Sequence, residues 1–557
     1  MSSDAGYPAG PSTAGEVVES PWKTTGARAS AGVNVLGGLF LGFIIGFVPI
    51  MFEYQSYVAD CSRYTAADAC NALTVAGCRW DNATAACVFP DHDTVACGLY
   101  ENQDSCKAND ACYWRYHKRV CQHRKGWDSN EQGLLAGAQI VGAMISSPTA
   151  GPLTNKIGRR ASIAVCAVVG LLGTLMIAIG WAAEERYAVL VVAEAVVGLV
   201  GGWLSVICPM YCGEMAARQL EETIGVLFQL AVTFGICCAA TMGLIFDPRP
   251  DTATPHAHLQ ERLQIVLAVQ WVVTLALIPA AWAMPESTLW LQERRAKQHD
   301  TNALLDDDVA RRSEDGQPAA ATPSVNVFRL RYLTPLLVGV ALASAQQLTG
   351  INAIMIYGPR LVGAIGLQPL VGNFCIMLWN FLTCCASVPL VRRFPPRVLY
   401  IASTSVATVA CAITGLAVVP GVLPSDSTAQ HVLSGLGIMA FIAAFECGIG
   451  PCFYVLAQDT FPAEVRSAGC SYTVWVQFAF NVVINWGFPV AMTAFSGGPS
   501  GDQDQGMSIC FFIFAGTGLV TAAYLILRMP KSNSELRREE QLLGEDPKTR
   551  AVTNASA

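Results

Sequence analysis

The sequence contains few charged residues, and this scarcity excludes most ordinary soluble proteins. Of its 557 residues, 14% are charged and 53% are hydrophobic, whereas a typical soluble protein carries about 25% charged residues. The apolar residues come in long blocks, and a helix that crosses a bilayer needs roughly 20 apolar residues in a row. The composition therefore predicts a protein that crosses a lipid bilayer many times.

Several functional signatures are also missing. The sequence shows no pairing of a nucleophile with a base, no Gly-rich loop that cradles phosphates and no cluster of metal ligands. We therefore expect no enzymatic activity, no cofactor and no metal, and nothing indicates a nucleic acid or an obligate protein partner. No secretory signal peptide precedes the first apolar block, and residues 1–32, rich in Ser, Gly, Ala and Pro, are predicted to form a disordered tail.

The apolar blocks number twelve, which predicts an all-α membrane protein with 12 transmembrane helices in two six-helix bundles. The blocks lie at 33–53, 132–152, 162–183, 187–210, 224–246, 264–284, 333–363, 369–391, 398–420, 431–457, 468–494 and 507–528. The predicted N-terminal bundle covers 33–284 and includes a Cys-rich loop at 54–130. A polar linker at 285–332 separates it from the C-terminal bundle at 333–528, and a tail at 529–557 follows.

The distribution of Lys and Arg predicts the orientation of these helices. Short cytosolic loops carry an excess of both residues. Arg159 and Arg160 follow the second block, Arg392 and Arg393 follow the eighth, and Arg528 ends the twelfth. All these loops lie on one side of the predicted membrane. We therefore expect that side, the linker and both termini to be cytosolic, and the long loop after the first helix to be extracellular.

The long loop holds eight of the 21 cysteines: Cys61, Cys70, Cys78, Cys87, Cys97, Cys106, Cys112 and Cys121. An even number of cysteines in an extracytosolic segment indicates four disulfides, for which 105 pairings are possible. A zinc module is the less favoured alternative, because the spacing lacks paired CxxC ligands. The sequence Asn82-Ala83-Thr84 in the same loop predicts a glycosylation site at Asn82.

The helix interiors contain several amides, which predict a site for an uncharged, polyhydroxylated solute. An amide both donates and accepts hydrogen bonds, so it can bind neighbouring hydroxyls without burying a charge. The simpler alternative is that such amides join helices to one another. Gln346 and Asn352 are six residues apart, so they face one cavity only if the helix bends at Gly350. Gln346 and Tyr357 share one helix face. Gln477 and Asn481, four residues apart, also share a face.

A second polar group lies at the predicted cytosolic ends of the helices. We expect pairs among these residues to close an inner gate and to break when the two bundles rock; the alternative is solvated charge that only sets orientation. The group comprises Arg159, Arg160, Glu214, Glu286, Arg393, Arg397, Asp459 and Arg466. Glu194 and Glu446 instead lie inside apolar blocks, where a carboxylate indicates function or a specific partner. We group Glu446 with the predicted gating residues.

These patterns resemble the sugar-porter branch of the major facilitator superfamily over residues 33–530. The family's GxxxD(R/K)xGRR, PESPRWL, QQxxGxNxxxYY and tenth-helix motifs appear at Gly151–Arg160, Pro285–Leu291, Gln346–Tyr357 and Glu446–Asp459. Asn155 stands at the Asp position of the first motif. The Cys-rich loop looks like that of the kinetoplastid hexose transporters, which carry glucose and fructose. Together with the oxidised loop, this resemblance implies a plasma-membrane location.

The resemblance also implies which residues contact the sugar. They are Gln229, Gln346, Gln347, Asn352, Asn380, Tyr357, Phe453, Tyr454, Gln477 and Asn481. Two positions depart from the family pattern, since Tyr454 replaces its usual Trp and Gln477 its usual Asn. Ile44 stands where proton-driven members carry Asp, and an aliphatic side chain cannot bind a proton. Glu194 stands where the family has Arg.

The resulting prediction is a facilitative hexose transporter that works by alternating access. One alternative is a proton-coupled sugar or polyol symporter, in which Glu194 or Glu446 binds the proton. A second is a sensor that binds sugar without carrying it. Sensors often carry a long cytosolic extension, and the short predicted tail at 529–557 argues against this alternative.

Overall fold

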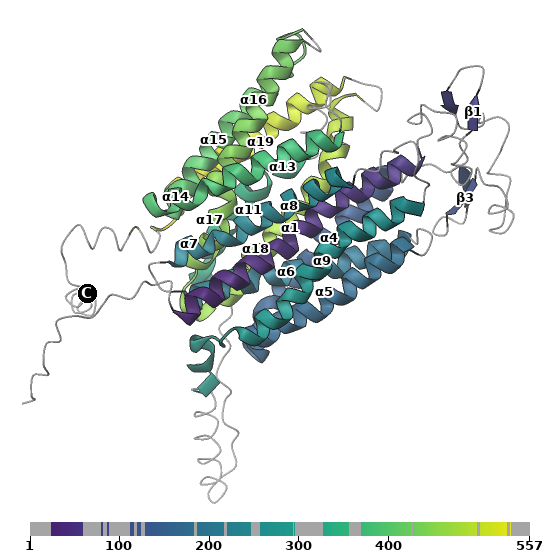
Figure 1. The fold of residues 1–557 in the computed structure, drawn as a ribbon. Coiled ribbons are helices and arrows are strands. Elements are labelled where there is room, and N and C mark those ends of the chain that lie inside the picture. Colours follow the sequence, from purple (N-terminus) through teal and green to yellow (C-terminus); the bar gives the residue numbers. More distant parts are fainter. Residues whose placement is uncertain are drawn as a thin grey trace, which may run out of the picture.

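The computed structural model of the chain describes residues 24–59, 79–81, 86–88, 112–115, 120–123, 129–182, 187–216, 220–246, 257–292, 294–295, 327–355, 369–424, 427–497, 502–531 and 535. Long helices dominate these residues and run side by side in two groups, with two short hairpins beyond one end (Figure 1). We call that end the hairpin side. We call the opposite end the arginine side, after Arg159, Arg331 and Arg397, which lie at the starts of helical elements.

The first group of helices contains the chain up to residue 283. Its helices are α1 (Thr25–Ala59), α4 (Ser129–Ile157), α5 (Arg159–Ala182), α6 (Tyr187–Met215), α7 (Glu221–Gly225), α8 (Leu227–Ile245) and α9 (Ala257–Ala283). Residues 288–292 are also helical. The hairpins pair β1 (Arg79–Asp81) with β2 (Ala86–Val88), and β3 (Cys112–Arg115) with β4 (Val120–His123).

The second group is built from shorter pieces joined end to end. It contains η5 (Leu330–Tyr332), α11 (Leu333–Gln347), α13 (Pro369–Cys385), α14 (Ser387–Arg393), α15 (Pro396–Ala417), α16 (Thr428–Ala444), η6 (Phe445–Ile449), α17 (Gly450–Asp459), η7 (Ala463–Val465), α18 (Arg466–Phe495) and α19 (Gln503–Arg528). A helix at 351–355 continues α11 after a break. The element η6 is a π-helix, whereas η5 and η7 are 3-10 helices.

Within the described residues, eleven helical segments are long and apolar enough to cross a membrane. The remaining predicted block, the second at 132–152, lies in α4, which has 29 residues but is not among these eleven. Its interior carries buried polar side chains, including Gln139, Ser146, Ser147 and Thr154. Helix α4 packs against α6 and α18, so this polar face meets protein and not lipid.

Close approach of small residues holds α1 against α8. A Cβ added at Gly38 would lie 2.4 Å from the Phe228 carbonyl oxygen, and one at Gly42 only 2.0 Å from that of Val232. Such glycines let helix backbones touch, which is how helices associate when water supplies no driving force. Helix α1 also begins at Thr25, eight residues before the predicted block. The tail prediction is wrong for residues 25–32, because Gly26 packs against the Met215 carbonyl and extends the helix.

The two groups meet along two pairs of helices. Helix α4 lies against α18, and α8 lies against α13, so each pair contains one helix from each group. On the arginine side, small residues again make the contact: a Cβ added at Gly151 would lie 2.8 Å from Ser467 Oγ, and one at Gly213 2.5 Å from Gln458 Oε1. We refer to these groups as the N-terminal and C-terminal halves.

The loop cysteines are only partly described. Cys61, Cys70, Cys78, Cys97 and Cys106 lie outside the described residues, as does the glycosylation candidate Asn82. Cys87, Cys112 and Cys121 lie in strands β2, β3 and β4. In the described helices, thirteen cysteines are free thiols.

Candidate functional site

A buried carboxylate meets a buried amide where the two halves touch. Gln229 of α8 donates from Nε2 to both carboxylate oxygens of Glu446, at 3.3 and 3.4 Å. Both side chains are buried. Gly450 makes room for them, because a Cβ there would lie 3.1 Å from Gln229 Nε2 and 3.2 Å from Glu446 Oε2. The contact joins a residue of the N-terminal half to one of the C-terminal half.

Glu446 lies in the π-helical segment η6, where the regular α-helical ladder of the tenth membrane helix is interrupted. Such single π turns often occur at functional sites. The Cys384 thiol of α13 is within hydrogen-bonding reach of the same carboxylate and of the Thr233 hydroxyl. A buried carboxylate needs donors of this kind to offset its lost hydration. Glu446, which we grouped with the gating residues, thus contacts Gln229, a predicted sugar-binding residue.

Three further amides of the C-terminal half have buried oxygens without a hydrogen-bond partner. They are Gln346 Oε1 in α11, Asn380 Oδ1 in α13 and Gln477 Oε1 in α18. Buried polar atoms are nearly always hydrogen-bonded, so each exception asks for an explanation. Asn380 stands one helical turn before Cys384, which connects it to the Glu446 cluster, and α11 packs directly on α18. Three acceptors left open on three helices are suited to a ligand rich in hydroxyl donors.

The helix that carries Gln346 breaks as predicted. Helix α11 ends at Gln347, Gly350 has a φ of +94°, and Asn352 follows in the next helical piece. The break lets Asn352 Nδ2 reach back and donate to Gln347 Oε1 at 2.8 Å. Tyr357 lies outside the described residues. Asn481 accepts a hydrogen bond on its side-chain oxygen from Asn485, so these two amides pair within α18.

The two predicted aromatic contacts are buried in this conformation. Phe453 and Tyr454 are adjacent in α17 and their rings meet edge to face, with centroids 5.1 Å apart. Phe228 of the N-terminal half packs edge to face on Tyr454 at 4.9 Å. Tyr454 therefore bridges the two halves close to Gln229, which follows Phe228 in α8. That either ring stacks on a sugar stays a prediction.

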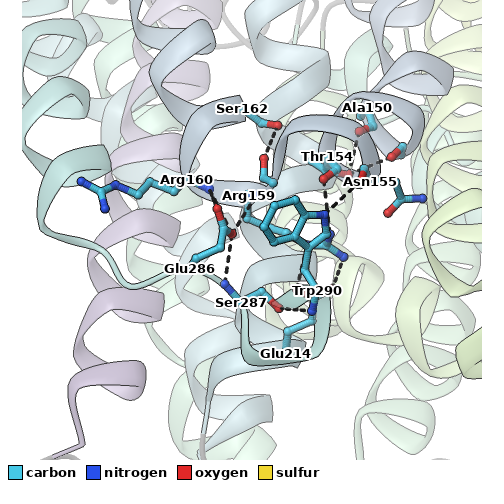
Figure 2. A network of polar contacts seen from close by, with 12 residues as sticks. Ala150, Thr154, Asn155, Arg159, Arg160, Ser162, Glu214, Glu286, Ser287 and Trp290 are labelled. Atoms are coloured by element: carbon cyan, nitrogen blue, oxygen red, sulfur yellow. Dashed lines mark hydrogen bonds and ion pairs between the residues drawn. The ribbon is translucent and has the colours of Figure 1, made fainter. Parts of the chain in front are cut away.

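A charge network lies on the arginine side of the N-terminal half (Figure 2). The Arg159 guanidinium binds the Glu214 carboxylate through two hydrogen bonds, of 2.8 Å from Nε and 2.5 Å from Nη2. The Arg159 side chain is 5% exposed and that of Glu214 is 11% exposed. Two parallel bonds between a guanidinium and a carboxylate are strong and geometrically specific, so this pair fixes the start of α5 on the end of α6.

Glu286 stabilises the starts of two helices at once. Its Oε1 accepts hydrogen bonds from the backbone N–H of Arg159 at 2.8 Å and of Ser287 at 3.0 Å (Figure 2). A carboxylate at a helix N-terminus satisfies free N–H groups and favours the helix dipole. Gly158 has a φ of +92°, and a Cβ there would lie 2.5 Å from Glu286 Oε2. Trp290 completes the cluster by donating from Nε1 to the Asn155 carbonyl at 3.0 Å.

These pairs connect helices of one half only, which corrects the predicted gate. Arg159, Arg160, Glu214 and Glu286 form contacts within the N-terminal half, so those contacts need not break when the halves move. Arg397 binds Glu535 and the Met529 carbonyl inside the C-terminal half. Close glycine contacts, such as that of Gly151 with Ser467, join the halves here instead. A linear sequence shows which side a charge lies on but not which half its partner belongs to.

The remaining predicted gating residues lie at helix ends on the arginine side. Arg393 ends α14, Asp459 ends α17 and Arg466 begins α18. The Nε of Arg466 is buried without a hydrogen-bond partner, as are the hydroxyls of Ser467 and Ser471. The sequence pattern missed the pair of Arg331 with Glu464, at 2.5 Å and largely exposed.

Glu194 occupies a different place from the amide cluster. It is 1% exposed in α6, and its Oε2 has no hydrogen-bond partner. One turn later Gly198 packs against the Gln139 backbone, and Gly201 faces Leu41 and Ile44 of α1. Glu194 therefore lies in the core of the N-terminal half. Ile44 is buried there as an apolar side chain.

Comparison with known proteins places this arrangement in a family. Residues 31–529 match the family model described as "Sugar (and other) transporter". Glucose transporter 2A of Trypanosoma brucei brucei is 34% identical over 497 residues, covering 88% of this chain and 85% of that protein. Membrane transporter D2 of Leishmania donovani is 33% identical over 501 residues, covering 87% and 86% of the two chains.

The arrangement of helices also matches a solved structure. The proton:xylose symporter XylE, bound to 6-bromo-6-deoxy-D-glucose, superposes with a TM-score of 0.63 at 18% sequence identity. The match covers 90% of this chain and 96% of that one. XylE, which comes from E. coli, is a major facilitator superfamily protein. This chain has the same fold, and by its sequence it belongs to the sugar transporter family.

Proposed function

We propose that this protein carries hexoses, glucose and also fructose, across the plasma membrane by facilitated diffusion. The observation that carries the proposal is the set of open acceptors, Gln346 Oε1, Asn380 Oδ1 and Gln477 Oε1, in the half that also holds Glu446. Hexose hydroxyls are donors that match these acceptors. The relatives named as glucose transporters support the choice of glucose.

Sugar binding is proposed to exchange one set of hydrogen bonds for another. The Gln229–Glu446 contacts of 3.3 and 3.4 Å are long for hydrogen bonds to a carboxylate, so they are weak and easily replaced. A hydroxyl entering between the two side chains would donate to Glu446 and accept from Gln229. Because these residues belong to opposite halves, the sugar would then connect the halves where the protein alone holds them weakly.

Transport follows when the halves rock about this site. The Arg159–Glu214–Glu286 network and the α1–α8 contact keep the N-terminal half together, so it moves as one body. The contacts that must open on the arginine side are those of Gly151 and Gly213 with the C-terminal half. Gly151 and Gly213 meet the neutral side chains of Ser467 and Gln458, so opening these two contacts separates no opposite charges.

We propose uniport because the buried apolar side chain of Ile44 stands in α1 where proton-driven members of the family carry Asp. Without a coupled ion, net flux stops when the sugar concentrations on the two sides are equal. The arginine side is proposed to be cytosolic, as the positive-inside rule requires, and the hairpin side extracellular.

The proposal is tested by uptake of radiolabelled glucose in cells that lack their own hexose carriers. Saturable uptake that unlabelled glucose and fructose compete for, and that falls strongly in Gln346→Ala, supports it. A protein that reaches the cell surface but takes up no hexose contradicts it. Binding of labelled glucose to the purified protein without uptake would identify a sensor instead.

A proton-coupled symporter is a second candidate, favoured by one observation. Glu194 is buried with a carboxylate oxygen that has no partner, and such a group is more stable with a proton bound. Adding sugar to an unbuffered suspension of cells distinguishes the two functions. A symporter would make the medium alkaline and Glu194→Gln would abolish the change, whereas a uniporter leaves the pH constant.

A further inference from the structure

Helix α9 ends on the arginine side with an exposed tryptophan. Its exposed residues from 265 to 282 follow one another at intervals of three or four: Ile265, Ala268, Val272, Leu275, Pro279 and Trp282. All of them are apolar and lie on one face of the helix, which is the face that a membrane helix turns to lipid. Trp282, the last of them, is 75% exposed. A Trp at the end of such a face is expected at the level of the lipid headgroups.

The guanidinium of Arg160 lies beside this tryptophan. Its Cζ is 5.9 Å from the centroid of the Trp282 ring, and its Nε donates to the Ala281 carbonyl at 3.0 Å. Among the described residues, the two Nη groups have no hydrogen bond or ion pair, and Glu286 accepts only from the backbone N–H of Arg160. In Figure 2 the Arg160 side chain extends away from the cluster around Trp290. The protein therefore fixes this cation at the end of α9 and leaves its Nη donors open to a ligand.

The short helix at 288–292 adds a second surface that is both apolar and basic. Leu289 and Leu291 are exposed, whereas Trp290 between them is buried. The Arg294 guanidinium lies over the Trp290 ring, 5.0 Å from its centroid. The hydrogen bonds drawn in Figure 2 hold this short helix against the start of α5. Two exposed cations, each beside a tryptophan, therefore lie on the arginine side of the N-terminal half.

The exposed charges of this region all have one sign. At this end of α4, α5 and α9, the exposed charged side chains that the structure describes are Lys156, Arg160, Arg294 and Arg295. The carboxylates of Glu214 and Glu286 already bind Arg159 and backbone N–H groups. A phosphate group finds donors here. The choline or ethanolamine cation of a zwitterionic headgroup finds no open carboxylate among the described residues, so the surface suits a lipid with net negative charge.

We propose that Arg160 and Trp282 bind an anionic phospholipid from the leaflet on the arginine side. The open Nη groups of Arg160 donate to the lipid phosphate, and Trp282 packs on the glycerol and the upper part of an acyl chain. The cytosolic leaflet supplies such lipids, and the arginine side is the side that we propose to be cytosolic. The lipid site rests on the membrane fold and not on sugar transport, so either proposal can fail without the other.

Quenching of tryptophan fluorescence by brominated lipids tests the proposal on the full-length protein in vesicles. All vesicles contain the same mixture of phosphatidylcholine with a minor fraction of phosphatidylglycerol, and an equal amount of one or the other lipid carries bromine on its upper acyl chain. The chain has 12 tryptophans, so the quenching of Trp282 is the difference between the unsubstituted protein and Trp282→Phe. We expect brominated phosphatidylglycerol to quench Trp282 several-fold more strongly than brominated phosphatidylcholine. Equal quenching by the two lipids, or none by either, would overturn the proposal.

Two substitutions, each measured with and without Trp282→Phe, distinguish a site from a general attraction of charge. Arg160→Gln should lower the quenching by phosphatidylglycerol to the level of phosphatidylcholine. Arg331→Gln is the matched control, because Arg331 is also exposed on the arginine side but lies over Tyr332 in the C-terminal half, and it should leave the quenching of Trp282 unchanged. Equal losses in the two variants, or no loss in Arg160→Gln, would contradict the site. The comparison of the two brominated lipids in the unsubstituted protein decides the proposal even if Arg160→Gln does not fold.

Discussion

The open amide oxygens favour the proposed binding site over a structural join between helices. An amide that joins helices has its hydrogen bonds satisfied in the protein alone, whereas Gln346 Oε1 and Gln477 Oε1 are buried and unpaired. The protein carries the desolvation cost of these atoms in the empty state, and a sugar that supplies donors recovers it. At this scale the sequence predicted that these amides lie inside the helices, but not that their oxygens would be free.

Gln346→Ala is therefore expected to weaken transport without weakening the fold. Losing one hydrogen bond to a neutral partner, about 0.5–1.5 kcal/mol, should raise the KM for glucose roughly two- to tenfold. The melting temperature of the purified protein should stay constant or rise, since a buried unpaired atom is removed. Gln264→Ala is the control, because Gln264 already donates to the Ala178 carbonyl at 3.1 Å and should affect stability more than KM. A fall in stability with unchanged KM in Gln346→Ala would show a structural amide.

Burial decides how much each ion pair contributes. Glu214→Ala would leave the buried Arg159 guanidinium without its carboxylate and should cost about 3–5 kcal/mol, as for other buried pairs. Glu464→Ala breaks the pair with Arg331, whose side chains are 62% and 45% exposed, and should cost about 0–1 kcal/mol. Thermal unfolding of both variants measures the difference. Equal losses would mean that the Arg159 network does not stabilise the N-terminal half.

At the scale of the element, breaks in the helices place the site. Gly350 ends one helix piece and lets Asn352 reach Gln347, and the sequence predicted this break from spacing and a glycine. The π-helical turn at Phe445–Ile449 was not predicted as such, because Gly448 and Gly450 indicate an interruption without specifying its hydrogen bonds. The surroundings of α4 were likewise not predictable, because its polar face is buried by α6 and α18, which are distant from it in the chain.

Gly350→Ala should disrupt the seventh membrane helix. Alanine at a φ of +94° costs about 1–2 kcal/mol, and its Cβ would lie 2.4 Å from the Phe514 ring. We expect a lower melting temperature and at least a severalfold loss of glucose uptake. Gly435→Ala, in α16 where a Cβ meets nothing within 4 Å, should stabilise the helix slightly and leave uptake unchanged. Equal effects of the two substitutions would show that the break at Gly350 is dispensable.

At the scale of the whole molecule, the contacts that hold each half together differ from the contacts between the halves. The Arg159–Glu214 pair and the Glu286 cap lie within the N-terminal half, whereas the contacts of Gly151 and Gly213 and the Gln229–Glu446 hydrogen bonds lie between the halves. The apolar blocks and motifs predicted the all-helical membrane fold and the sugar transporter family. The sequence did not predict that the ion pairs of Arg159 and Arg397 would lie within one half, because the choice of partner depends on three-dimensional packing.

The central claim is that sugar moves down its own gradient without an ion, and one measurement tests it directly. Purified protein reconstituted into liposomes is given labelled glucose with an imposed inward proton gradient, and parallel samples contain a protonophore. The account predicts that internal glucose rises to the external concentration and stops, with identical results in both samples. Accumulation above the external concentration that the protonophore abolishes would contradict the account and assign proton coupling to a buried acid such as Glu194.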